Sequence, residues 1–124
     1  MRVMLIGELP ETVDFSDPAL PPGTTAQKIH AGLDRAMNEM AQRGWKAELC
    51  LIKPDDSGTN QLEEYLDRHP YDCIVIGGGI RIPPKRLLFF EKVLNIVHAK
   101  APRANIAFNT GPENTPDAAA RWEH

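Results

Sequence analysis

Four short hydrophobic runs divide the chain, and each is followed by residues typical of turns. Residues 3–6 and 71–76 are apolar apart from Asp72, which is typical of strands buried on both faces of a parallel sheet. In a strand over residues 46–53, successive side chains would lie on opposite faces, an arrangement that suits a strand nearer a sheet edge. Residues 105–108 supply a fourth strand. The pattern therefore predicts four strands.

The segments between these runs have helical features. Residues 24–27 match the capping box, and hydrophobic residues then recur at helical spacing until Gly44. Ser57 is the expected N-cap of a second helix, which must end near His69 because Pro70 disfavours helical backbone before it. Two prolines suit the first turn of a third helix. The expected helices cover residues 24–44, 57–69, 83–101 and 115–122.

Alternation of strands and helices predicts an α/β protein. Right-handed crossovers of this length produce a doubly wound parallel sheet with helices on both faces, a three-layer α/β/α architecture that resembles the flavodoxin-like fold. The two most apolar strands belong at the centre, so we predict the strand order 2-1-3-4. A chain of 124 residues is long enough for one core and too short for two, so residues 1–124 should form a single domain.

Composition narrows the classes of partner. Lys and Arg total 14 against 17 for Asp and Glu, a net charge of -3, which provides no broad basic field for nucleic acid or an anionic membrane. No apolar run reaches the ~20 residues of a membrane span, and no signal-peptide pattern follows Met1. We therefore expect a cytoplasmic protein. Cys50 and Cys73 fall in separate strands without metal-ligand spacing, which indicates buried reduced thiols and no metal site.

The usual nucleotide motifs are missing from the expected strand ends. Residues 7–10 follow the first strand and contain neither the dinucleotide glycine pattern nor the Walker pattern. Glu8 and Glu11 would repel the phosphate of a flavin mononucleotide. A receiver domain would carry a phosphoacceptor aspartate after the third strand, where this chain has Gly77–Gly79. We therefore expect no cofactor.

Three segments carry a family resemblance. Residues 17–23 read DPALPPG, residues 77–81 read GGGIR and residues 108–112 read FNTGP. Through these segments, and over nearly its whole length, the chain resembles a group of short bacterial proteins of flavodoxin-like or Rossmann-like fold that has no assigned activity. The resemblance implies the fold and transfers no catalytic residue.

Candidate ligand-binding residues cluster where the strands end, because ligands of open parallel sheets bind beyond the carboxyl ends of the strands. If the protein is an enzyme, we assign Glu8 as a general base or metal ligand, Arg81 as an anion anchor and Asn109 as an orienting group that forms hydrogen bonds. Two alternatives to ligand binding remain open. In one, the glycines only form a turn beside solvated basic residues. In the other, the short polar side chains of Asn109 and Thr110 cap the following turn. The full predicted site is Glu8, Gly77, Gly78, Gly79, Arg81, Asn109 and Thr110.

The connection after the first strand is unusually long. Residues 8–22 contain four prolines and several apolar residues, which indicates either an ordered lid or a structural cover. Residues 8–17 hold four acids and no base, whereas residues 81–103 hold six bases and one acid. If these segments form opposite walls of a pocket, it would suit a small anionic or zwitterionic metabolite. Alternatively, they neutralise each other as solvated pairs.

The third predicted helix has a surplus of apolar surface. Its hydrophobic residues cover an arc of about 180°, wider than one packed face requires. We therefore predict a homodimer through Phe89, Val93 and Ile96. Two functions follow as hypotheses: a small-molecule site at the strand ends, with or without catalysis, or a non-catalytic interaction protein that uses this helix and the 8–22 loop.

Overall fold

A four-stranded parallel sheet forms the centre of the protein, in a computed structural model that describes residues 1–123. The sheet order is β2-β1-β3-β4, as predicted. β1 and β3 are the central strands, and their register pairs Val3 with Cys73. The strands are β1 (Arg2–Glu8), β2 (Lys46–Ile52), β3 (Cys73–Ile76) and β4 (Asn105–Phe108).

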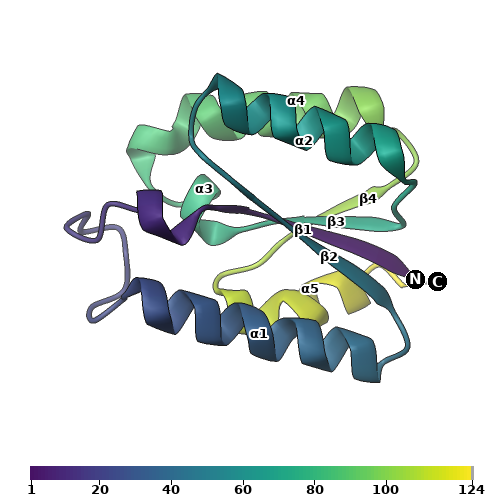
Figure 1. The fold of residues 1–124 in the computed structure, drawn as a ribbon, viewed down its shortest axis with the longest axis horizontal. Coiled ribbons are helices and arrows are strands. Elements are labelled where there is room, and N and C mark those ends of the chain that lie inside the picture. The colour runs from purple at the N-terminus through teal and green to yellow at the C-terminus, as the bar shows by residue number, and fades with distance from the viewer. Residues whose placement is uncertain (124) are drawn as a thin grey trace.

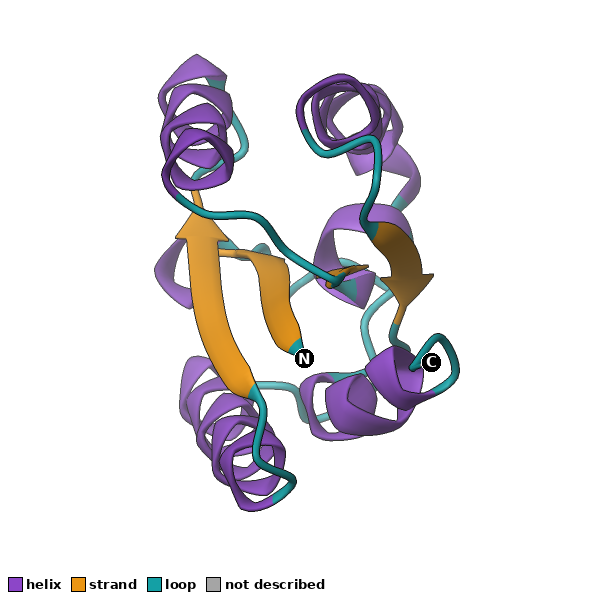
Figure 2. Cartoon of the chain, turned by 90° about the vertical axis from the view of Figure 1, so that its right-hand side faces the viewer, coloured by secondary structure: helices purple, strands orange, loops and turns teal. Residues whose placement is uncertain are grey.

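Helices cover both faces of the sheet, so the predicted three-layer, flavodoxin-like α/β/α fold is confirmed (Figures 1 and 2). α1 (Ala26–Gln42) and α5 (Thr115–Ala120) lie on one face, while α2 (Asp56–Arg68) and α4 (Leu87–Lys100) lie on the other. Within residues 1–123, no helix has the length and apolar character needed to cross a bilayer. Short helical turns are η1 (Pro10–Thr12), α3 (Gly78–Arg81), η2 (Pro84–Arg86) and η3 (Pro112–Asn114).

Side-chain alternation along β1 creates two separate cores. Val3 and Leu5 pack with residues of α1 and α5, whereas Met4 and Ile6 pack with residues of α2 and α4. Cys50 and Cys73 are free thiols, one in each core, and burial raises their pKa values to about 12 and about 11. They are buried and reduced, as predicted.

Three predicted helix starts are displaced, each for a local reason. The Thr25 hydroxyl caps α1 by accepting from the Lys28 amide at 3.2 Å, one residue later than expected. Asp55 is the cap of α2, and the predicted cap Ser57 lies inside the helix and donates to the Asp55 carboxylate. The third long helix begins only at Leu87, because prolines lack the amide that would continue it and the chain first forms η2.

Two of the three residues predicted to form the dimer face are buried within the protein. Phe89 and Val93 belong to the core under α2 and α4, and Ile96 is partly buried against the same core. The wide apolar arc of α4 is used inside the protein, since this helix packs against both the sheet and α2. The apolar side chains that α4 leaves exposed are Leu87 and Leu88.

Adjacent positions on α4 should therefore respond very differently to a charge. Phe89→Glu would bury a carboxylate in the core and should reduce the free energy of unfolding by about 3 kcal/mol or more. Leu88→Glu, at a position 73% exposed, is the matched control and should change it by less than about 0.5 kcal/mol. Urea denaturation measures both values. Equal effects would contradict the orientation of α4.

Candidate functional site

A cleft of about 540 Å³ opens beyond the carboxyl ends of the strands, on the α1 side of the sheet. The cleft lies there because the two central strands, β1 and β3, have no side chain at their carboxyl ends on the face toward α1. Leu5 pairs with Val75, and the next residues that face α1 are Gly7 and Gly77, which both line the cleft. The hollow is therefore a direct result of glycine at the ends of two neighbouring strands.

The walls of the cleft are mainly apolar. Leu5 and Leu51 contribute from the sheet, and Ile29 and Leu33 contribute from α1. The long connection between β1 and α1 folds over the opening and supplies a third wall. Its apolar lining residues are Val13, Ala19, Leu20, Pro21 and Pro22.

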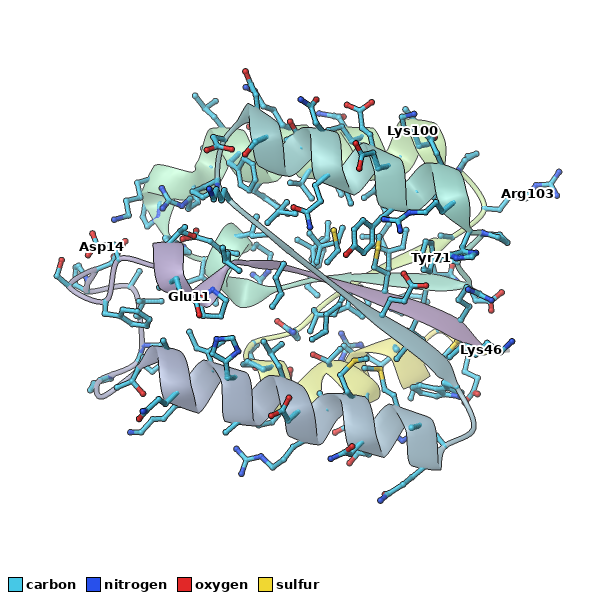
Figure 3. The ribbon with its side chains drawn as sticks, in the orientation of Figure 1. Glu11, Asp14, Lys46, Tyr71, Lys100 and Arg103 are labelled. Atoms are coloured by element: carbon cyan, nitrogen blue, oxygen red, sulfur yellow. The ribbon has the colours of Figure 1, made fainter. Side chains whose placement is uncertain are left out.

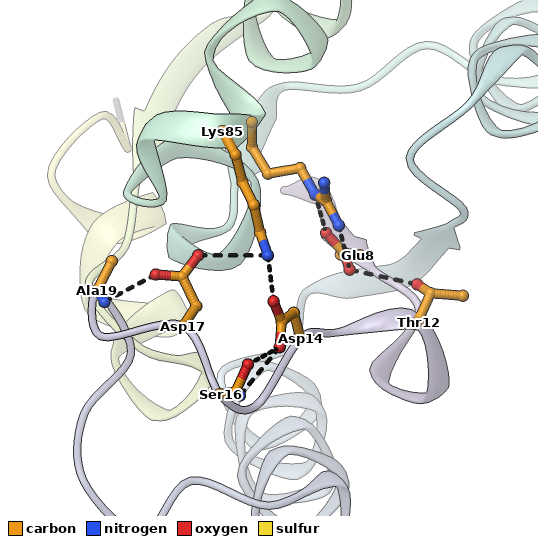
Figure 4. A network of polar contacts seen from close by, with 8 residues as sticks. Glu8, Thr12, Asp14, Ser16, Asp17, Ala19 and Lys85 are labelled. Atoms are coloured by element: carbon orange, nitrogen blue, oxygen red, sulfur yellow. Dashed lines mark hydrogen bonds and ion pairs between the residues drawn. The ribbon is translucent and has the colours of Figure 1, made fainter.

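Glu8 is among the residues that line the cleft, but its carboxylate is held by Arg86. Arg86 Nε donates to Glu8 Oε1 at 2.8 Å and Nη2 to Oε2 at 3.4 Å, while the Thr12 hydroxyl donates to Oε2 at 3.3 Å (Figure 4). The Glu8 side chain is only 3% exposed, and its hydrogen bond raises the pKa of Arg86. Both carboxylate oxygens are occupied by these contacts, which gives Glu8 a structural role in this geometry. Its role as a base or metal ligand stays a prediction.

The expected glycine turn is the start of a short helix, α3. The Gly77 amide donates to the Ile6 carbonyl at 2.8 Å, and a Cβ on Gly77 would approach that oxygen to 3.1 Å. The Gly78 amide donates to Asn109 Oδ1 at 2.9 Å. Gly79 is exposed, lines the cleft and has open space around its Cα. Close backbone approach thus requires glycine at position 77 but not at position 79.

Asn109 and Thr110 line the cleft, yet their polar groups stabilise the surrounding turns. The Asn109 amide, which is buried, accepts from Gly78 and donates to the Thr115 hydroxyl at 2.9 Å. Thr110 exchanges two hydrogen bonds with Asn114. Of the two interpretations given above for these residues, the structure favours capping.

Arg81 is not among the residues that line the cleft, and its buried Nε has no hydrogen-bond partner among residues 1–123, so its role as an anion anchor stays a prediction. Its guanidinium donates to the Asn109 carbonyl at 3.0 Å and lies 5.4 Å from the centre of the Phe108 ring. The side chain thus lies against Phe108 of β4 and contacts the cleft only through the backbone carbonyl of Asn109, a lining residue.

The acidic and basic segments neutralise each other instead of forming opposite walls. The Lys85 ammonium donates to the Asp14 carboxylate and lies 3.6 Å from Asp17 Oδ2 (Figure 4). This contact lowers the pKa of Asp14 and raises that of Lys85. Glu11 pairs with His30 Nε2 at 3.0 Å. The four acids of residues 8–17 are thereby paired, Glu8 with Arg86, Glu11 with His30, and Asp14 and Asp17 with Lys85.

Lys28 is the charged residue that the sequence interpretation missed. It is exposed, lines the cleft from the first turn of α1, and has no ion-pair partner among residues 1–123. Glu113, on the neighbouring wall, lies 3.4 Å from Arg35. A signal for Lys28 was present, because the first turn of a helix that follows a parallel strand borders the strand ends.

No group of three or more His, Cys, Asp or Glu side chains is arranged to hold a metal ion within residues 1–123. No protein-family model matches the chain, and no curated protein matches it significantly. Function must therefore be inferred from the geometry of the cleft and its charges.

Removing the Asn109 bridge should weaken the frame of the site. Asn109→Leu keeps a similar volume but leaves the Gly78 amide without its partner, so we expect the free energy of unfolding to fall by about 1–3 kcal/mol. The matched control is Asn95→Leu, because Asn95 is exposed on α4 and donates only to the Glu91 carbonyl. Urea denaturation compares the two variants. Equal stability would show that the bridge contributes nothing.

Proposed function

We propose that the protein binds a small molecule with an apolar body and one anionic group, such as a carboxylate, in the cleft at the strand ends. The observation that carries this proposal is the combination of a mainly apolar hollow with the unpaired ammonium of Lys28 on its wall. A volume of about 540 Å³ is within the usual range for small-molecule sites, which are mostly apolar with a few polar groups that orient the ligand.

The apolar walls favour a ligand that is itself largely apolar. Leu5, Leu33 and Leu51 line the part of the cleft formed by the sheet and α1. Covering them with an apolar group removes hydrocarbon surface from water, which contributes roughly 25 cal/mol for each Å². A highly polar sugar or nucleotide would lose its hydration without gaining equivalent hydrogen bonds there.

The charges around the cleft favour an anion. Glu8 is neutralised by Arg86, and Glu113 already lies beside Arg35. Lys28 is left as the charge that a ligand can pair with. A carboxylate near this ammonium would gain a charge-assisted hydrogen bond, whereas a zwitterion would find no equally free carboxylate for its amine.

The proposal concerns binding rather than a reaction. The hydroxyl groups that line the cleft are those of Thr24 and Thr110, and each has a hydrogen-bond partner within its own turn. No serine, cysteine or histidine of residues 1–123 lines the hollow. The serine–histidine and cysteine–histidine pairs used by many covalent mechanisms are thus not among its walls in the described part of the chain.

Displacement of a fluorescent probe tests the proposal. The probe is 1-anilinonaphthalene-8-sulfonate, an apolar anion, and the competitors are octanoate and octan-1-ol, which differ in charge. We expect octanoate to compete more strongly than the alcohol. Lys28→Met should weaken octanoate binding about 3- to 10-fold, the effect of one partly exposed charge contact, and leave octan-1-ol unchanged.

Lys46→Met is the matched control, because Lys46 is exposed at the opposite end of the sheet (Figure 3). This variant should bind both competitors as the wild-type protein does. Equal loss of octanoate binding in the two variants would contradict the role of Lys28. Failure of both competitors to displace the probe would contradict the cleft as a binding site.

The alternative function, a homo-oligomeric interaction protein, is favoured by the exposure of Leu87 and Leu88 at the start of α4. Self-association remains a prediction, with these residues in place of the buried ones first assigned to it. Under this alternative, sedimentation velocity should show a dimer at high micromolar concentration, and Leu88→Glu should dissociate it. A monomeric wild-type protein at that concentration would contradict it.

A further inference from the structure

Residues 13–24, which we call the lid segment, have almost no backbone attachment to the rest of the protein. Their backbone hydrogen bonds run from Val13 to Pro10, Asp17 to Asp14, Leu20 to Asp17 and Thr24 to Pro21, so all are local. Within residues 1–123, none connects the lid segment to a strand or to a long helix. A segment bonded mainly to itself can move as a unit without breaking the sheet.

One side chain provides the polar attachment. Lys85, in η2, contacts Asp14 and Asp17 (Figure 4). Within the described part of the chain, no other side chain outside residues 13–24 bonds to the lid segment. The side chains of Lys85 and Asp14 are 43% and 44% exposed, whereas that of Asp17, 3.6 Å from the ammonium, is 9% exposed. Exposed ion pairs contribute little to stability and are screened by salt, so the Lys85–Asp14 contact can open at low cost.

The two ends of the lid segment are anchored much more firmly. Before it, the Leu9 amide donates to the Ile52 carbonyl at 2.8 Å, and the buried Glu8–Arg86 pair holds the end of β1. After it, the Thr25 cap starts α1. Gly23 has a φ of 78°, a backbone conformation that glycine adopts at no steric cost. Movement would therefore be confined between Val13 and Gly23.

The lid segment also covers the proposed site. Val13, Leu20 and Pro21 line the cleft, so the same residues that lack backbone attachment form one of its walls. An apolar ligand in the cleft would contact these side chains and favour the closed position of the segment.

We propose that residues 13–24 form a lid that opens to admit the ligand, and that Lys85 is the latch that holds it closed through Asp14 and Asp17. This inference rests on the proposed function for its ligand, but the motion itself can be measured without one. The latch sets how often the cleft opens, whereas Lys28 and the apolar walls set how tightly the ligand binds.

Limited chymotrypsin digestion measures opening in the absence of ligand. Phe15 lies in the lid segment, is 40% exposed and is a cleavage site for this protease. In Lys85→Met, we expect cleavage after Phe15 to accelerate about two- to fivefold. In the wild-type protein, raising NaCl from about 0.05 to about 0.5 M should produce a similar acceleration, because screening weakens the same contact.

Lys92→Met is the matched control, since Lys92 is an exposed lysine of α4 whose nearest carboxylate is Asp56 at 3.9 Å. Its cleavage rate should equal that of the wild-type protein. Urea denaturation should give the same midpoint for all three proteins, so that faster cleavage reflects local opening. Equal cleavage rates in Lys85→Met and Lys92→Met would overturn the latch.

Stopped-flow fluorescence with 1-anilinonaphthalene-8-sulfonate tests whether the lid controls the cleft. In Lys85→Met, the association and dissociation rates should both rise by a similar factor, with little change in the dissociation constant. Faster cleavage with unchanged probe rates would show a mobile segment that does not gate the site, which overturns the inference. Faster cleavage with no probe binding at all would instead refute the proposed function.

Discussion

Side-chain alternation at the end of β1 determines how this end of the protein is organised. Gly7 faces α1 and Glu8 faces α4, so one strand creates a hollow on one side of the sheet and a buried ion pair on the other. The parallel register adds Gly77 beside Gly7 and enlarges the hollow. A shift of one residue in this register would exchange the two sides, placing the carboxylate in the cleft and the glycine against Arg86.

The polar residues at the strand ends maintain the shape of the cleft more than they provide its chemistry. Asn109 joins the start of α3 to the start of α5, and Arg81 binds the Asn109 carbonyl. Buried polar side chains generally find partners in the protein itself, and among residues 1–123 the buried side-chain nitrogen or oxygen that has no hydrogen-bond partner is Arg81 Nε. The groups left for a ligand are apolar walls and the ammonium of Lys28, which is why the geometry favours an apolar anion.

The long connection between β1 and α1 is held firmly at its start and weakly along its length. The Glu8–Arg86 pair at its base is largely removed from water, whereas the Lys85–Asp14 pair is exposed. Burial of the first pair makes its loss costly, and exposure of the second makes its opening easy. Such a difference allows residues 13–24 to move while β1 and the sheet remain in place.

The strand order and the two helix layers followed from the sequence alone, because buried strands and amphipathic helices carry repeating patterns that few folds satisfy. The strand ends were also identified correctly, since parallel strands bring them to one edge. Which side chain faces the cleft was decided only by tertiary structure: Arg81 turned toward β4, Phe89 turned into the core, and Lys28 reached the hollow. These outcomes depend on helix starts, on the path of a long loop and on competition between charges far apart in the chain, and none of these is encoded in a local pattern.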